Sequence, residues 1–126
     1  MRKIMALVCV SAGLATGCTT SNITNLTPSR QVRKANGFYP VEMQWRSTQR
    51  SIKEESIKPM VVIGTEFYPM RKTQIVGNRW ETVIPVAATN DLVYYTFKVD
   101  FDYYDIPIVR PDSRKSQTFQ LKLTDR

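Results

Sequence analysis

The sequence predicts an all-β domain in which two antiparallel sheets pack face to face. Apolar and polar residues alternate with period two in several segments, and turn-forming residues recur at short intervals. No segment has a convincing helical pattern. Strands with one apolar and one polar face become stable when two such sheets bury their apolar faces against each other. We expect six or seven strands.

The segment 19–36 is polar and allows two interpretations. It is either a flexible tether or a short edge strand at 23–26, stopped by Pro28 and followed by a turn at Asn36 and Gly37. We favour the strand, because Asn-Gly is a strong turn signal. From residue 39 to residue 46, apolar and polar residues alternate, which predicts a half-buried strand.

The middle of the chain is less regular. Residues 47–58 are charged and predict either a turn of helix or a long hairpin loop. In the segment 59–67, the apolar run 60–63 is typical of a central strand. Residues 68–76 form a weaker, edge-like segment that Pro69 interrupts.

The two clearest strands follow. The first alternates over residues 80–86 and ends near a turn at 89–91. The second covers residues 92–104 and, at about 3.3 Å per residue, would span roughly 40 Å. Because that is long for one strand, we expect a bulge or bend near Asp100. A loop through Pro107 and residues 111–113 comes next, and the last strand turns Phe119, Leu121 and Leu123 inward. The long strand has these residues on one face: Val93, Tyr95, Phe97, Val99, Phe101 and Tyr103.

An immunoglobulin-like β-sandwich without a disulfide fits this series of strands best. A transthyretin-like sandwich or a small β-barrel is the alternative. Residues 78–81, 84–86 and 95–100 also resemble the middle strands of early-set Ig-like modules found beside starch-active enzymes. Phe101 follows Asp100 where those modules have glycine, so the resemblance supports the fold rather than a sugar site.

The N-terminus has the parts of a secretory signal peptide. Residues 1–17 combine a basic start, a short apolar run and small residues. The apolar run is too short to span a bilayer as a helix, which takes about 20 residues. We therefore expect residues 1–17 to be removed on export.

Ala15-Thr16-Gly17-Cys18 resembles the lipobox of bacterial lipoproteins, although Ala15 stands where Leu is commonest. The resemblance implies cleavage between Gly17 and Cys18, with a diacylglyceryl group on the Cys18 sulfur and an acyl chain on its amine. Two or three acyl chains anchor a protein to a bilayer for long periods. An ordinary cleaved signal with a free or disulfide-bonded Cys18 is the alternative.

The lipobox defines the domain boundaries and the compartment. We expect the lipidated cysteine and a tether at 18–22, extending to 36 in the alternative, and the sandwich domain at 23–126. Because Cys9 leaves with the signal and Cys18 carries lipid, the mature chain has no thiol and no disulfide. In Gram-negative lipoproteins Asp after the cysteine favours the inner membrane, so Thr19 favours the outer membrane of the cell envelope.

Charge and residue types exclude most chemistry. The mature chain has 16 basic and 11 acidic residues, a net charge of +5. The basic residues are scattered apart from Arg30, Arg33 and Lys34, which we interpret as solvated surface rather than a nucleic-acid site. The chain has no histidine, which removes most general bases, triads and zinc sites. Asp100, Asp102 and Asp105 lack calcium-loop spacing, so we expect no enzyme, cofactor or metal.

Aromatic residues are the remaining candidates for a binding site. Four tyrosines on polar faces or near strand ends are candidate contacts to a partner or a glycan: Tyr68, Tyr94, Tyr103 and Tyr104. The other apolar-face aromatics belong to the expected core. We therefore hypothesise a non-catalytic module, held at the membrane by lipid, that binds another envelope protein. The alternative is a glycan-binding module for peptidoglycan, lipopolysaccharide or polysaccharide.

Overall fold

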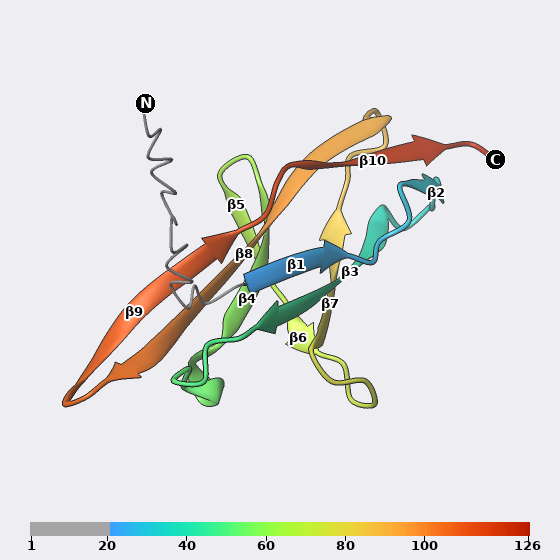
Figure 1. Cartoon of the computed structure of the whole chain (residues 1–126). Coiled ribbons are helices and arrows are strands. Elements are labelled where there is room, and N and C mark those ends of the chain that lie inside the picture. Colours follow the sequence, from blue (N-terminus) through green and yellow to red (C-terminus); the bar gives the residue numbers. More distant parts are fainter. Residues whose placement is uncertain (1–20) are drawn as a thin grey trace, which may run out of the picture.

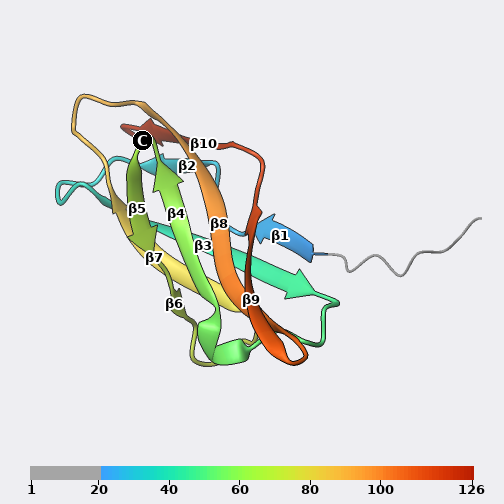
Figure 2. The same ribbon diagram turned by 90° about the vertical axis from the view of Figure 1, so that its left-hand side faces the viewer.

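A computed structural model describes residues 21–126, and the predicted signal peptide at 1–17 and the predicted lipidation site Cys18 lie outside this range. The described residues form a sandwich of two sheets, with the strands of one layer crossing those of the other (Figures 1 and 2). One short 3₁₀ turn, η1 (Glu54–Ser56), interrupts the β-structure of this part of the chain. The all-β prediction is confirmed.

The first sheet has the order β1-β3-β7-β6 and is antiparallel throughout. The second has the order β2-β10-β8-β4-β5, with β9 also paired to β8. The strand bounds in the first sheet are β1 Ser21–Asn25, β3 Phe38–Ser47, β6 Arg71–Lys72 and β7 Arg79–Pro85. Those in the second are β2 Arg30–Val32, β4 Lys58–Ile63, β5 Glu66–Pro69, β8 Leu92–Asp105, β9 Ile108–Lys115 and β10 Phe119–Thr124.

This order defines an immunoglobulin-like fold. In the strand lettering of the immunoglobulin fold, β1, β3, β7 and β6 correspond to strands A, B, E and D. In the second sheet, β4 corresponds to C, β8 to F, and β9 with β10 to G. The added strand β5 extends the second sheet beyond β4, as in variable-type domains. One pair differs from the antiparallel expectation, because β2 runs parallel to β10.

For the N-terminal segment, the sequence allowed either a flexible tether or an edge strand. The described part of it, residues 21–36, contains both β1 and β2. β1 is the edge strand expected near residues 23–26, and it begins at Ser21. Gly37 has φ +70°, so the turn occurs at the predicted Asn-Gly pair and uses a conformation that favours glycine. Residues 48–57 carry the chain from β3 to β4 in the other sheet, so the hairpin-loop alternative for this segment is wrong.

Near the end of the chain, the expected loop at 111–113 and the bulge alternative near Asp100 are wrong, while the bend alternative is not contradicted. Residues 111–113 belong to β9 rather than to a loop, and Pro111 pairs with Asp102. Proline is tolerated there because β9 is an edge strand, with β8 as its one neighbour. β8 keeps one register with β9 through Asp100, so no bulge occurs at that position.

The irregularity lies opposite Phe97 instead. Lys115 pairs with Lys98, whereas Phe119 pairs with Tyr95, which leaves one extra residue between β9 and β10. The Phe97 amide donates to the Ser116 hydroxyl at 2.8 Å, and the Ser116 amide donates to the Phe97 carbonyl at 2.9 Å. The bulge therefore belongs to the partner of β8, and β8 itself remains continuous.

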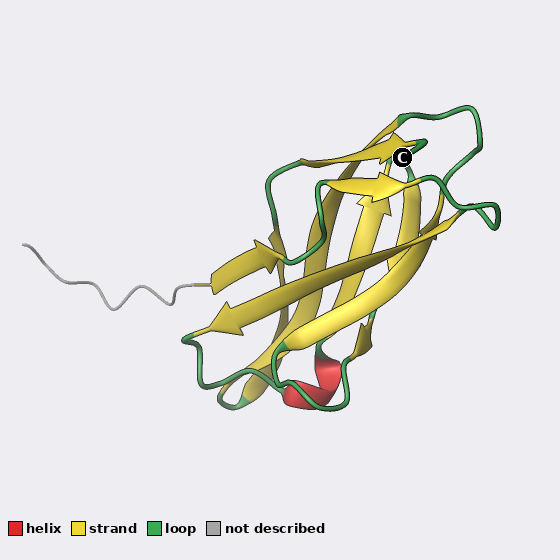
Figure 3. Cartoon of the chain, turned by 90° about the vertical axis from the view of Figure 1, so that its right-hand side faces the viewer, coloured by secondary structure: helices red, strands yellow, loops and turns green. Residues whose placement is uncertain are grey.

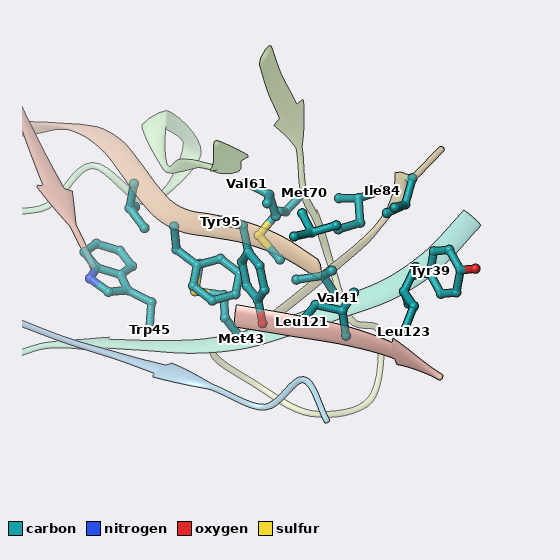
Figure 4. Close-up of a cluster of buried hydrophobic side chains, with 14 of the residues drawn as sticks. Tyr39, Val41, Met43, Trp45, Val61, Met70, Ile84, Tyr95, Leu121 and Leu123 are labelled. Carbon is teal, nitrogen blue, oxygen red and sulfur yellow. The ribbon is translucent and has the colours of Figure 1, made fainter. Parts of the chain in front are cut away.

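The predicted inward faces meet in one core (Figure 4). Tyr39, Tyr95 and Phe97 are among the largest fully buried side chains, and Trp45 packs 5.4 Å from the Phe101 ring, centroid to centroid. Buried aromatic polar atoms have partners: Asn25 Nδ2 donates to the Tyr95 hydroxyl at 2.8 Å. The core therefore needs no disulfide between the sheets.

Arg33, from the basic cluster interpreted as solvated surface, is partly exposed and ion-paired. Its guanidinium donates to the Ala88 carbonyl at 2.8 Å and to Asp125 at 3.2 Å, and it forms an ion pair with Asp91. The hydrogen bond to Asp125, with a further one to Asp91, raises the pKa of Arg33 above its usual value. This side chain links the segment after β2 to the β7–β8 turn and to the C-terminal residues.

Candidate functional site

One end of the sandwich collects the start of β1 and the turns on either side of it. Ser21 pairs with Ser47, and Trp45 Nε1 donates to the Ser21 hydroxyl at 2.8 Å. The Trp45 amide donates to the Asn78 carbonyl at 3.0 Å, which brings the start of β7 to the same place. We call this the entry end; it holds the start of β1, residues 48–57, residues 73–78 and the β8–β9 turn (Figure 3).

Residues 48–57 pack against the end of β8. The Lys53 amide donates to the Asp102 carbonyl at 2.9 Å, and the Tyr104 amide donates to the Ser51 carbonyl at 2.8 Å. The Ser56 hydroxyl accepts from the Asp102 amide at 2.7 Å. These bonds give this side of β8 backbone partners after β4 has ended, and they hold the base of the β8–β9 hairpin in place.

The β8–β9 hairpin projects beyond the sheet (Figure 1). Along β8, the pairing with β4 ends at Asp100, while the pairing with β9 continues to Asp105. Four apolar side chains at the tip are substantially exposed: Tyr104 49%, Ile106 90%, Ile108 50% and Val109 48%. The nearest charges neutralise each other, because Arg110 Nε donates to Asp105 at 2.6 Å.

A second exposed apolar turn lies between β6 and β7. The side chain of Ile75 is 97% exposed, and that of Val76 is 42% exposed. The Thr73 hydroxyl donates to the Val76 carbonyl at 2.9 Å, which closes this turn locally. In Figures 1 and 2 this turn, η1 and the hairpin tip all lie at the lower end of the molecule.

The outer face of the second sheet carries an apolar patch away from the entry end. Phe67 on the edge strand β5 lies opposite Val62, and Pro69 lies opposite Met60. The Phe67 side chain is 55% exposed, and Lys98 Nζ lies 6.0 Å from its ring centroid. We call these four residues, Met60, Val62, Phe67 and Pro69, the β4–β5 patch.

The four candidate tyrosines fall into two groups. Tyr94 and Tyr104 are exposed, whereas Tyr68 and Tyr103 are partly buried and pack against the core. Ten residues separate the two exposed rings along β8, which corresponds to roughly 33 Å. They therefore cannot stack on one short sugar chain, and the structure does not bring the four tyrosines together.

Two of the acidic residues of β8 form separate ion pairs. Asp100 lies 3.5 Å from Lys98 Nζ, and Asp105 pairs with Arg110. Within residues 21–126 no cluster of carboxylates suits a metal ion. A groove of about 710 Å³ beside them is lined by Lys53, Lys58 and Asp112 among others, so opposite charges meet there.

Sequence reasoning missed the hairpin tip and the turn at 73–78. The tip was assigned to a loop because Pro107 and Pro111 are turn formers, although the uncharged run 106–109 was a signal that an apolar turn was present. Neither turn has a feature that sequence alone ties to the start of β1.

In the described part of the chain, no helix is long and apolar enough to cross a membrane.

No protein-family model matches the chain, and no curated protein sequence matches it. Among solved structures, it is similar to murine CRIg, with a TM-score of 0.46 and 14% sequence identity. The similarity covers 82% of this chain and 98% of the CRIg chain. The assignment to the immunoglobulin-like class rests on the strand order described above.

Proposed function

We propose that this protein is a lipid-anchored lipoprotein of the outer membrane that acts as a non-catalytic binding module for another envelope protein. The β4–β5 patch carries the proposal, because a contiguous apolar surface lies there beside an uncovered strand edge. The lipobox at Ala15–Cys18 supports the anchor.

The patch combines two means of holding a protein. Phe67 is an exposed aromatic residue next to Val62 and Met60, and aromatic anchors of this kind carry much of the energy of protein interfaces. β5 has β4 as its one neighbour, so its other backbone edge is open to an added strand. Pro69 limits that pairing to the first part of β5.

An exposed apolar surface on the first sheet serves as a comparison. Phe38 is 49% exposed and lies opposite Pro85, while Val83 lies opposite Pro40. However, β3 and β7 are both interior strands in the order of their sheet, whereas β5 is the terminal strand of its own. The partner we propose therefore has an apolar surface and an extended segment that meets β5.

Site-specific photocrosslinking in the native envelope tests this function. Phe67 is replaced by a photoreactive phenylalanine analogue, and Phe38 receives the same replacement as the matched control. We expect a discrete protein adduct from position 67 and none from position 38. Equal labelling from both positions, or an adduct to glycan instead of protein, would contradict the proposal.

A further inference from the structure

We infer that the entry end of the domain rests on the bilayer, with the tips around Ile106 and Ile75 as membrane contacts in addition to the lipid. This inference rests on the proposed lipid anchor at Cys18. Ile75 and Ile106 have the highest exposed fractions among the large apolar side chains of the described chain. Both lie in turns that Figures 1 and 2 place at the lower end of the molecule, together with η1.

The length of chain outside the structure limits where the bilayer lies. Three residue steps separate Cys18 from Ser21, and a fully extended chain covers about 11 Å over that length. A lipid on Cys18 therefore holds the start of β1 close to the membrane surface. Ser21 and Asn22, the last two residues of the tether expected at 18–22, already belong to β1.

The hairpin reaches further than this short connection. Arg114 and Ser21 line one shallow depression, so the base of the hairpin lies beside the start of β1. Six residue steps separate Arg114 from Ile108 at the start of β9, a length of about 20 Å along the strand. Figure 1 shows the hairpin tip on the side where β1 begins, so a membrane held at Cys18 meets the tip.

The chemistry of the tip suits the membrane interface. Residues 106–109 are uncharged, and the Asp105–Arg110 pair beside them is already neutralised. Tyr104 lies opposite Val109, just behind the tip, and tyrosine is enriched where proteins meet the headgroup layer. Ile75 and Val76 supply a second contact, and two contacts together with the lipid define an orientation.

This orientation has a consequence for the proposed partner site. β4 runs away from the entry end, since Lys58 pairs with Asp100 and Val62 pairs with Thr96. Phe67 lies opposite Val62, so the β4–β5 patch is on the membrane-distal half of the sheet. The bilayer thus leaves that patch accessible to a protein.

Fluorescence quenching with single-cysteine variants tests the inference. The acylated full chain is reconstituted into vesicles of phosphatidylethanolamine and phosphatidylglycerol, some with nitroxide groups on their acyl chains. Since acylation consumes the thiol of Cys18, an introduced cysteine is the one site for a fluorophore. The variants are Ile106→Cys, Ile75→Cys and the membrane-distal control Phe67→Cys.

We expect the label at 106 and at 75 to be quenched at least about twofold, as for groups at the headgroup–acyl boundary, and the label at 67 to stay unquenched. If the chain floats with the vesicles and all three labels stay unquenched, the inference is wrong while the anchor stands. If the tip labels are shielded only when envelope proteins are present, the entry end binds protein and the inference is again wrong. If the purified chain lacks acyl groups and does not float, the anchor fails and the inference fails with it.

Discussion

The two halves of β8 have different surroundings. From Leu92 to Asp100 the strand pairs with β10 and then β9 on one side, β4 pairs with it on the other side from Thr96 to Asp100, and alternate side chains are buried in the core. From Phe101 onward β9 is its one strand neighbour, and exposure rises toward the tip. One continuous strand thus has a first half that stabilises the sandwich and a second half that presents apolar side chains to the outside.

The largest expected effect comes from the first half. Phe97→Ala removes a fully buried ring that packs edge-on against Tyr95, at 5.5 Å between centroids. We expect a loss of about 3–5 kcal/mol in the free energy of unfolding, because the cavity adds to the lost apolar burial. Urea unfolding followed by tryptophan fluorescence measures the change. A loss below about 1 kcal/mol would show that Phe97 is not part of a tightly packed core.

A smaller effect is expected from Tyr95→Phe. The substitution keeps the ring and removes the hydroxyl that accepts the hydrogen bond from Asn25 Nδ2. We expect a loss of about 1 kcal/mol in the free energy of unfolding, since the amide loses a partner. Tyr94→Phe on the exposed face is the matched control and is expected to be silent. Equal effects in both variants would contradict the assignment of this bond to the first half of β8.

The smallest effect on stability is expected in the second half. Ile106→Ser changes a side chain that is 90% exposed, so we expect the free energy of unfolding to stay within about 0.5 kcal/mol of the original. The same urea titration measures this change. A loss comparable to that of Phe97→Ala would mean that the hairpin tip packs against the domain rather than facing outward.

The sequence predicted the first half of β8 better than the second. The alternation from Val93 to Phe101 depends on burial in the core, and period-two patterning reports burial directly. β9 was missed because it is an edge strand in which Pro111 and Asp112 are tolerated, so its residues have loop chemistry. The partial burial of Tyr103 agrees with its place on the apolar face of the alternation, whereas that of Tyr68 depends on packing by distant segments, which periodicity alone does not reveal.

The engagement of Arg33 was also beyond sequence reasoning. Its partners lie 55 to 92 residues away along the chain. From sequence alone, Arg33 was grouped with its neighbours Arg30 and Lys34, and nothing there indicates ion pairs with distant residues. By contrast, the turn at Gly37 was predicted correctly because a local conformational requirement determines it. Local signals were therefore reliable, whereas contacts across the sandwich required the structure.

Mass spectrometry of the protein from its native host tests the central claim most directly, since the proposed membrane attachment depends on Cys18. The account predicts a mature chain that begins at Cys18 and carries a diacylglyceryl group on its sulfur and an acyl chain on its amine. A mature chain with an unmodified N-terminus, or one that begins at another residue, would contradict it.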